Sequence, residues 1–309
     1  MRILIFGAGV IGKIYGAKLF HSGFDVTLFA RRTNFQKLTD NGLTLKNKLT
    51  GEKIHSKIPV IQYSSTSQNF DIIIVTVQLD QLLPSIPTIK EFKNCENILF
   101  MLNNPKELKV IKVYFPTKNI LFGFPGVSGT KTENSIEFIQ IKQQNTTIGY
   151  DPNNSKIVEK IKYIFSKSGF PTVYERRMTD WLIIHAIFIT CTSVSILNEN
   201  SNSEQLSHNK KAVQKMVRSI KEGLKSCQEQ NITVVPKNIK TIFLTMPEWF
   251  SVFYWKRAMR GNIGKLGIEP HAKVATDELK ILARQVLEIV QNSKVKTTNI
   301  NSLLQKFIE

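Results

Sequence analysis

The chain has 309 residues, a formal net charge of +18 and 42% hydrophobic residues. This length suits two domains that each bury their own core, and the composition is that of an ordinary globular protein. The lysines are scattered between Lys13 and Lys306, with no basic stripe and no recognised nucleic-acid motif, so we expect no nucleic-acid partner. The basic field would instead attract small anionic molecules.

Cysteine usage and hydropathy indicate the compartment. Cys95, Cys191 and Cys227 are widely spaced and form no C-x-x-C pair, which favours a reducing compartment and argues against a disulfide framework or a zinc site. The first apolar run is too short for a signal peptide. Residues 181–197 are the most apolar long segment, but His185 and several hydroxyls interrupt them, which is typical of a buried helix. We therefore expect a cytoplasmic protein with no metal and no membrane partner.

The first 32 residues predict a strand at 3–6, a glycine-rich turn, a helix through residues 14–19 and a second strand at 26–30. In that order, the pattern G-x-G-x-x-G indicates a dinucleotide-binding site. Gly7 would permit the tight turn, Gly9 would let the backbone approach the pyrophosphate, and Gly12 would let the helix pack closely on the strand. The helix N-terminus then offers free N–H groups to the phosphates. The predicted cofactor-binding residues here are Gly7, Ala8, Gly9, Val10, Ile11 and Gly12.

The end of the second strand indicates which nucleotide binds. An NAD site normally has Asp or Glu there to hold the ribose 2′-OH. This chain reads Phe29-Ala30-Arg31-Arg32, with no acid. Two guanidinium groups suit a 2′-phosphate, so Arg31 and Arg32 favour NADP(H). The alternative is that both arginines belong to a solvated loop.

The elements that follow continue an α/β pattern. Residues 33–57 predict a helix around 35–38 and short polar strands, with turns at Asn41-Gly42 and Thr50-Gly51. The β-branched run at 72–77 predicts a central parallel strand, and Gln78 lies at its carboxyl end, where open α/β sheets bind their ligands. We expect a helix over 82–92, a strand over 98–102 that ends in Asn103-Asn104-Pro105, and strands over 120–124, 136–141 and 146–148.

The pattern changes near residue 175. A helix over 155–168 and a short strand over 172–174 come last in the α/β part, and the periodicity is then almost wholly helical. We expect a buried helix over 181–197, a polar loop over 198–209, a helix over 210–229, one final long helix over 271–292 and a short one near the end. The predicted fold is α/β, with an N-terminal Rossmann-type doubly wound sheet at 1–175 and an all-helical domain for substrate binding or dimerisation at 176–309.

These features together resemble the ketopantoate reductase family. The resemblance rests on the GAGVIG start, the Thr-Val before a glutamine, Asn103 after a later strand, the helical second half and the segment from His271 to Glu278. It covers most of the chain. It implies an NADPH-dependent enzyme that reduces a 2-keto acid on the route to pantothenate, with its active site in the cleft between two domains.

The resemblance also implies roles for single residues. Arg31 matches the residue that holds the 2′-phosphate, and Gln78 stands where many members have a lysine for the same group. Asn103 matches the family asparagine that touches nicotinamide ribose and substrate. Glu278 matches an acid near cofactor and substrate, although a surface carboxylate on a solvated helix face is an equal alternative.

The helix that begins near Trp181 departs from the family pattern. The family has a lysine two residues after the tryptophan, which protonates the developing alkoxide, and polar residues four and eight positions later. This chain has Ile183, Ile187 and Cys191 at those places, and apolar side chains donate no proton. A branch of the family carries Trp and His as at Trp181 and His185.

His185 is therefore a candidate acid with a suitable pKa near neutrality, although it lies on a different helix face from Ile183 and a lone histidine in an apolar helix is more often a satisfied core residue. Tyr254, Lys256 and Arg257 form a basic-aromatic cluster that would receive an acidic substrate or, alternatively, belong to a solvated helix face.

Two functional hypotheses remain, with His185 and Glu278 as the catalytic candidates in the first. The first is an NADP(H)-dependent oxidoreductase that reduces a small-molecule 2-keto acid such as 2-dehydropantoate. The second is an NADP-binding sensor that has lost the general acid. Both hypotheses are compatible with a homodimer. A nucleic-acid-associated basic protein would require the lysines to gather on one face.

Overall fold

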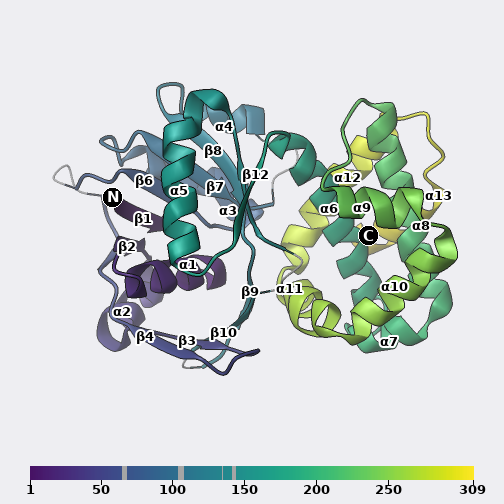
Figure 1. Cartoon of the computed structure of the whole chain (residues 1–309), viewed down its shortest axis with the longest axis horizontal. Coiled ribbons are helices and arrows are strands. Elements are labelled where there is room, and N and C mark those ends of the chain that lie inside the picture. Colours follow the sequence, from purple (N-terminus) through teal and green to yellow (C-terminus); the bar gives the residue numbers. More distant parts are fainter. Residues whose placement is uncertain (65–67, 104–107, 134, 141–143) are drawn as a thin grey trace. The chain divides into compact units, whose positions relative to one another are not determined.

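The structure is a computed structural model that describes residues 1–64, 68–103, 108–133, 135–140 and 144–309 (Figure 1). The chain divides into two compact units: unit 1 comprises Met1–Leu102 and Glu107–Met178, and unit 2 comprises Asn103–Lys106 and Thr179–Glu309. The predicted turn at Asn104-Pro105 and the predicted strand end at Ile141 lie outside the described residues.

Unit 1 is built on a large mixed sheet. Among the described residues, eight strands pair in the order β12-β11-β8-β7-β6-β1-β2-β5. β1 pairs in parallel with β2 on one side and with β6 on the other, so the strand order reverses beside β1. A doubly wound sheet binds its ligands at such a switch point. The strands are β1 (Arg2–Phe6), β2 (Asp25–Phe29), β5 (Val60–Ile61), β6 (Ile72–Val75), β7 (Asn97–Met101), β8 (Asn119–Phe124), β11 (Thr146–Gly149) and β12 (Thr172–Glu175).

A second, smaller sheet joins β3 (Leu43–Asn47), β4 (Lys53–Ser56), β9 (Ser128–Lys131) and β10 (Ile136–Ile139) in the order β4-β3-β10-β9. Helix α1 (Val10–His21) contacts β1 and β2 of the large sheet and all four strands of the small one (Figure 1). Because α1 packs against both sheets, it is apolar on more than one face and buries most of its residues. The remaining helices of unit 1 are α2 (Arg32–Asn41), α3 (Leu79–Lys90), α4 (Leu108–Tyr114), the short η1 (Pro152–Asn154) and α5 (Ser155–Lys167).

Unit 2 is all-helical in its described residues. Its elements are α6 (Met178–Leu197), α7 (Ser203–His208), α8 (Lys210–Glu229), α9 (Lys237–Lys240), η2 (Thr241–Thr245), α10 (Glu248–Arg260), η3 (Ile263–Ile268), α11 (Glu269–Val274), α12 (Thr276–Gln291) and α13 (Thr298–Ile308). A Cβ on Gly223 of α8 would lie 2.7 Å from Ile187 Cγ2 of α6, so this glycine lets the two helices approach closely. α6 is long and apolar enough to cross a membrane by length and composition, and 83% of its most apolar window is buried inside the structure.

The Rossmann-type sheet and the helical second half are as predicted, but several elements differ. The single final helix predicted over 271–292 is wrong, because Ala275 (φ −111°, ψ 32°) separates α11 from α12. The loop predicted over 198–209 contains α7, which begins at an Asn202 cap whose Oδ1 accepts the backbone N–H of Glu204 and of Gln205. Three further elements, α4, β5 and β9, have no counterpart among the predicted elements.

Candidate functional site

The glycine turn lies between β1 and α1. Gly7 has φ +115°, a conformation that side chains rarely adopt. A Cβ on Gly12 would collide with the backbone oxygen of Gly7 and lie 2.5 Å from Thr76 Oγ1. Thr76, which follows β6, donates from Oγ1 to the Gly7 oxygen at 3.0 Å. Helix α1 therefore packs directly on the carboxyl ends of β1 and β6.

The N-terminus of α1 is open. Gly9 is its N-cap residue, has no side chain to cap the helix, and a Cβ placed on it would have no atom within 4 Å. Ala8 is buried, whereas Val10 and Ile11 are half-buried. The first N–H groups of a helix have no partner within the helix. This backbone cradle therefore fits a diphosphate, which the helix dipole also favours.

The arginines after β2 lie at the start of α2. Arg31 donates from Nη2 to Thr88 Oγ1 at 3.0 Å, and its guanidinium carbon lies 5.6 Å from the centre of the Phe29 ring. Arg32 is exposed and has φ +50°. Gln78 is the exposed N-cap residue of α3, at the carboxyl end of β6. Two cationic groups and no carboxylate thus occupy the end of β2.

Unit 2 contains a polar cluster around Asn103. The Asn103 side chain is buried, and its Oδ1 lies 3.0 Å from Nδ1 of His185 on α6. Because an amide oxygen can only accept, the imidazole donates from Nδ1. Trp181, one turn earlier on the same face, stacks on the His185 ring with 5.0 Å between ring centres. His185 therefore fixes the orientation of the Asn103 amide.

The near-neutral pKa expected for His185 is wrong. Burial lowers the pKa of His185 to about 3, and repulsion from the His271 ring adds to this effect. A buried imidazole resists protonation because the charged form loses its hydration. His185 is consequently neutral near pH 7 and cannot act there as a cationic acid.

His271 and Glu278 are the other titratable groups of this cluster. His271 Nε2 lies 4.0 Å from Glu278 Oε2, and burial lowers the pKa of His271. Glu278 is only 6% exposed, so the alternative of a carboxylate on a solvated face is wrong. The sequence analysis did not single out His271 as a site residue. Its position seven residues before Glu278 gave no signal, because the break at Ala275 removes the helical register that would link the two.

The apolar positions of α6 are buried. Ile187 and Cys191 are fully buried and Ile183 is 9% exposed. Ile187 packs against α8 at Gly223, so this face belongs to the core of unit 2. In the predicted basic-aromatic cluster on α10, Tyr254 packs edge-on against Trp255, and Arg257 is exposed. Among the described residues no group of three His, Cys, Asp or Glu side chains could hold a metal ion.

The fold and the glycine turn define a Rossmann-type protein with an all-helical second unit. Residues 3–153 match the family described as ketopantoate reductase PanE/ApbA, so this part of the chain is a domain of the ketopantoate reductase family. The 2-dehydropantoate 2-reductase of Pyrococcus horikoshii is 26% identical over 188 residues, which are 59% of this chain and 58% of that protein. The aligned part therefore spans little more than half the length of this relative.

Solved structures share the fold over nearly the whole chain. D-mandelate dehydrogenase with NADH and anilino(oxo)acetate has a TM-score of 0.77 and 18% identity, and the match covers 99% of this chain and 97% of that one. A dimeric ketopantoate reductase from Staphylococcus aureus has a TM-score of 0.71 and 15% identity, over 100% of this chain and 99% of that one.

Proposed function

We propose that the protein is an NADP(H)-dependent oxidoreductase that reduces a 2-keto acid, such as 2-dehydropantoate, to the 2-hydroxy acid. The observation that carries this proposal is the start of α1 at Gly9, which has no side-chain cap and where a Cβ would meet no atom within 4 Å. Family membership and a structural neighbour solved with NADH support a nicotinamide nucleotide as the ligand.

The choice of NADP(H) rests on the end of β2. Arg31 and Arg32 would hold the 2′-phosphate through charge-assisted hydrogen bonds, and Gln78 would add a neutral contact. Arg31 is held by Thr88 and by the face of Phe29, so its guanidinium is already ordered and loses less entropy on binding. NADH lacks the 2′-phosphate, whose attraction would offset the loss of hydration of the two arginines.

When bound, the nicotinamide supplies the hydride. The protein must then provide a proton to the carbonyl oxygen and hold the substrate. With Asn103 Oδ1 turned to His185, the Asn103 amide N–H groups face away from the imidazole and can donate to a substrate oxygen. This assigns Asn103 to substrate and nicotinamide ribose, and His185 to positioning Asn103.

We assign the proton to the His271 and Glu278 pair. His271 is neutral on its own because burial lowers its pKa. A 2-keto acid brings a carboxylate, and a negative charge beside His271 favours protonation of the imidazole. The imidazolium would then donate its proton to the oxygen as the hydride reaches the carbon, which yields the hydroxyl and a neutral His271.

An NADP-binding sensor is the second candidate. Two observations favour it: the pKa values of His185 and His271 are both lowered, and apolar Ile183 stands where the family has its lysine. Both proposals predict NADPH binding, but only the first predicts turnover.

The test is to follow NADPH oxidation by absorbance with three kinds of substrate. These are 2-dehydropantoate, the 2-keto acid that is reduced to mandelate, and a wider panel of 2-keto acids. We expect turnover on at least one of them. In Asn103→Ala we expect that turnover to be lost, with a much smaller loss of NADPH affinity. Tight NADPH binding without turnover on any substrate would contradict the enzyme and leave the sensor. By analogy with the dimeric ketopantoate reductase of Staphylococcus aureus we also propose a homodimer, which light scattering would detect.

A further inference from the structure

Lys13 is an unusual residue in the first turn of α1. It immediately follows Gly12 of the glycine turn and is only 8% exposed. Lysine is almost never this buried unless an opposite charge accompanies it, because its ammonium group loses hydration. Among the described residues, Lys13 has no hydrogen bond, ion pair or cation–π contact of its side chain. The structure thus buries a cation without a counter-charge.

The charged groups around Lys13 are also cations. Its pKa is lowered, first by burial and then by repulsion from Lys131 on β9 and Lys37 on α2. No carboxylate contributes an opposing attraction. Lys37 and Lys131 are exposed and, like Lys13, have no polar partner among the residues that the structure describes. Lys13 and its two cationic neighbours are thus without a polar partner among these described residues.

The packing of β9 explains this convergence. A Cβ on Gly129 of β9 would lie 3.0 Å from side-chain atoms of both Val10 and Ile14, so β9 runs against the first turns of α1. Lys131 pairs with Ile136 of β10 across the small sheet, and directly opposite residues project from the same face. Ile136 is buried. Lys131 thus leaves the sheet on its buried face, the face that α1 covers.

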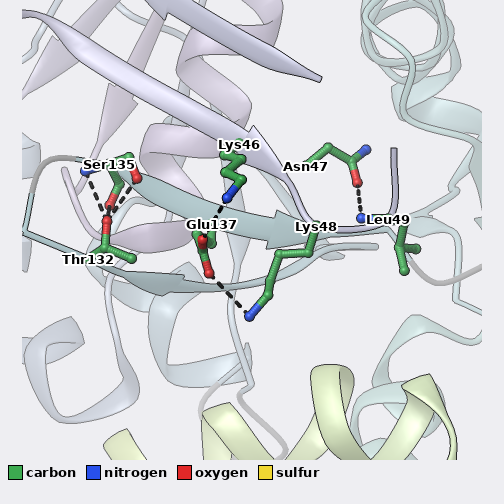
Figure 2. Close-up of polar contacts among 7 residues, drawn as sticks. All are labelled: Lys46, Asn47, Lys48, Leu49, Thr132, Ser135 and Glu137. Atoms are coloured by element: carbon green, nitrogen blue, oxygen red, sulfur yellow. Dashed lines mark hydrogen bonds and ion pairs between the residues drawn. The ribbon is translucent and has the colours of Figure 1, made fainter. Parts of the chain in front are cut away.

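The carboxylate on the neighbouring strand does not neutralise this cluster. Glu137 follows Ile136 and therefore projects from the opposite face of β10. Figure 2 shows Glu137 between two other lysines, with Lys48 Nζ at 3.1 Å and Lys46 Nζ at 3.4 Å. These contacts hold the pKa of Glu137 below its ordinary value. Glu137 is consequently already paired on the far side of the strand.

We infer that Lys13 and Lys131 form a subsite for a phosphate group beside the first turn of α1. A phosphate would supply the missing negative charge and accept hydrogen bonds from both ammonium groups at once. Two sources share this chemistry: a phosphate of bound NADP(H), which rests on the proposed function, and a free phosphate-bearing molecule, which does not.

The test compares Lys13→Met and Lys131→Met with Lys160→Met, which removes the same charge from an exposed position of α5. Calorimetric titrations use NADPH, NADH and inorganic phosphate. We expect Lys13→Met to weaken binding of at least one phosphate ligand by about tenfold or more, as the loss of a charge-assisted hydrogen bond does. Lys160→Met should leave it unchanged. Without ligand, Lys13→Met should melt at a higher temperature, because it removes a buried unpaired cation.

The arms of the test separate the two sources and the two proposals. A loss for NADPH but not for NADH identifies the 2′-phosphate, equal losses for both identify the pyrophosphate, and a loss confined to inorganic phosphate identifies a free ligand. If the wild-type chain binds phosphate through Lys13 but neither nucleotide, the proposed function fails and the subsite stands. Unchanged affinity for all three probes in both Lys13→Met and Lys131→Met would overturn the subsite.

Discussion

The protonation state of His185 makes a sharp prediction about acid stability. In the folded chain, burial lowers the pKa of His185 from its ordinary value of 6.5 to about 3. The unfolded chain therefore binds a proton here more tightly than the folded chain. The stabilisation from the neutral imidazole is complete above the unfolded pKa and is lost as the pH falls toward the folded value.

The size of this effect follows from the displacement of the pKa. At about pH 4.5 the unfolded imidazole is protonated and the folded one is still neutral, so about two pKa units of stability, or about 2.7 kcal/mol, are lost relative to neutral pH. His185→Gln does not titrate, and its amide N–H can still donate to Asn103 Oδ1. The variant should thus lose about 2.7 kcal/mol less than the wild type on acidification.

Urea unfolding at about pH 7.5 and about pH 4.5 measures this difference. The three tryptophans, Trp181, Trp249 and Trp255, all belong to unit 2, so their fluorescence reports the unfolding of the unit that contains His185. His208→Gln is the matched control, because it removes a histidine that is exposed on α7 of the same unit. If His185→Gln and the wild type lose the same stability between the two pH values, the buried neutral imidazole is refuted.

Three other substitutions test the site. Gly12→Ala should lower the free energy of unfolding in urea by about 1–3 kcal/mol or more. Its Cβ would collide with the Gly7 oxygen and approach Thr76 Oγ1 to 2.5 Å, so unchanged stability would contradict the close packing of α1 on β1. Arg31→Ala should weaken NADPH binding by about tenfold or more and leave NADH binding unchanged, whereas equal losses would show that Arg31 does not contact the 2′-phosphate. Glu278→Gln should lower kcat by about 10²-fold at unchanged NADPH affinity, and wild-type kcat would remove Glu278 from proton transfer.

Much of unit 1 could be predicted from the sequence, because short-range patterns encode its elements. The order of strand, glycine turn and helix at residues 2–21 is encoded by short-range patterns, and the β-branched run before Thr76 can only be a buried strand. The missed β9 shows the limit. Its sequence Ser-Gly-Thr-Lys has no strand pattern, and it forms because β10 offers an edge and Gly129 fits against α1. Such pairing is a tertiary effect.

The polar cluster of unit 2 was only partly predictable. His185, Asn103 and Glu278 could be chosen from the sequence by resemblance, but His271 could not, because the break at Ala275 gives its side chain a direction that helical periodicity does not describe. The near-neutral pKa predicted for His185 was wrong for a related reason. The ring is buried on α6 where it meets Asn103, which follows β7 and is 82 residues away in sequence, and short-range patterns do not report such a contact.

The proposed function depends on a diphosphate that lies against the backbone at Gly9. A calorimetric titration of Gly9→Ala is the sharpest test of that contact. Gly9 has φ −78° and ψ −170°, which alanine adopts without strain, and its Cβ would meet no protein atom within 4 Å. We predict that wild-type protein binds NADPH with measurable heat, and that Gly9→Ala keeps its unfolding midpoint but binds NADPH at least about tenfold more weakly, because the methyl group occupies the phosphate cradle. Equal NADPH affinity in the two proteins, or no heat from either nicotinamide nucleotide with the wild type, would contradict the account.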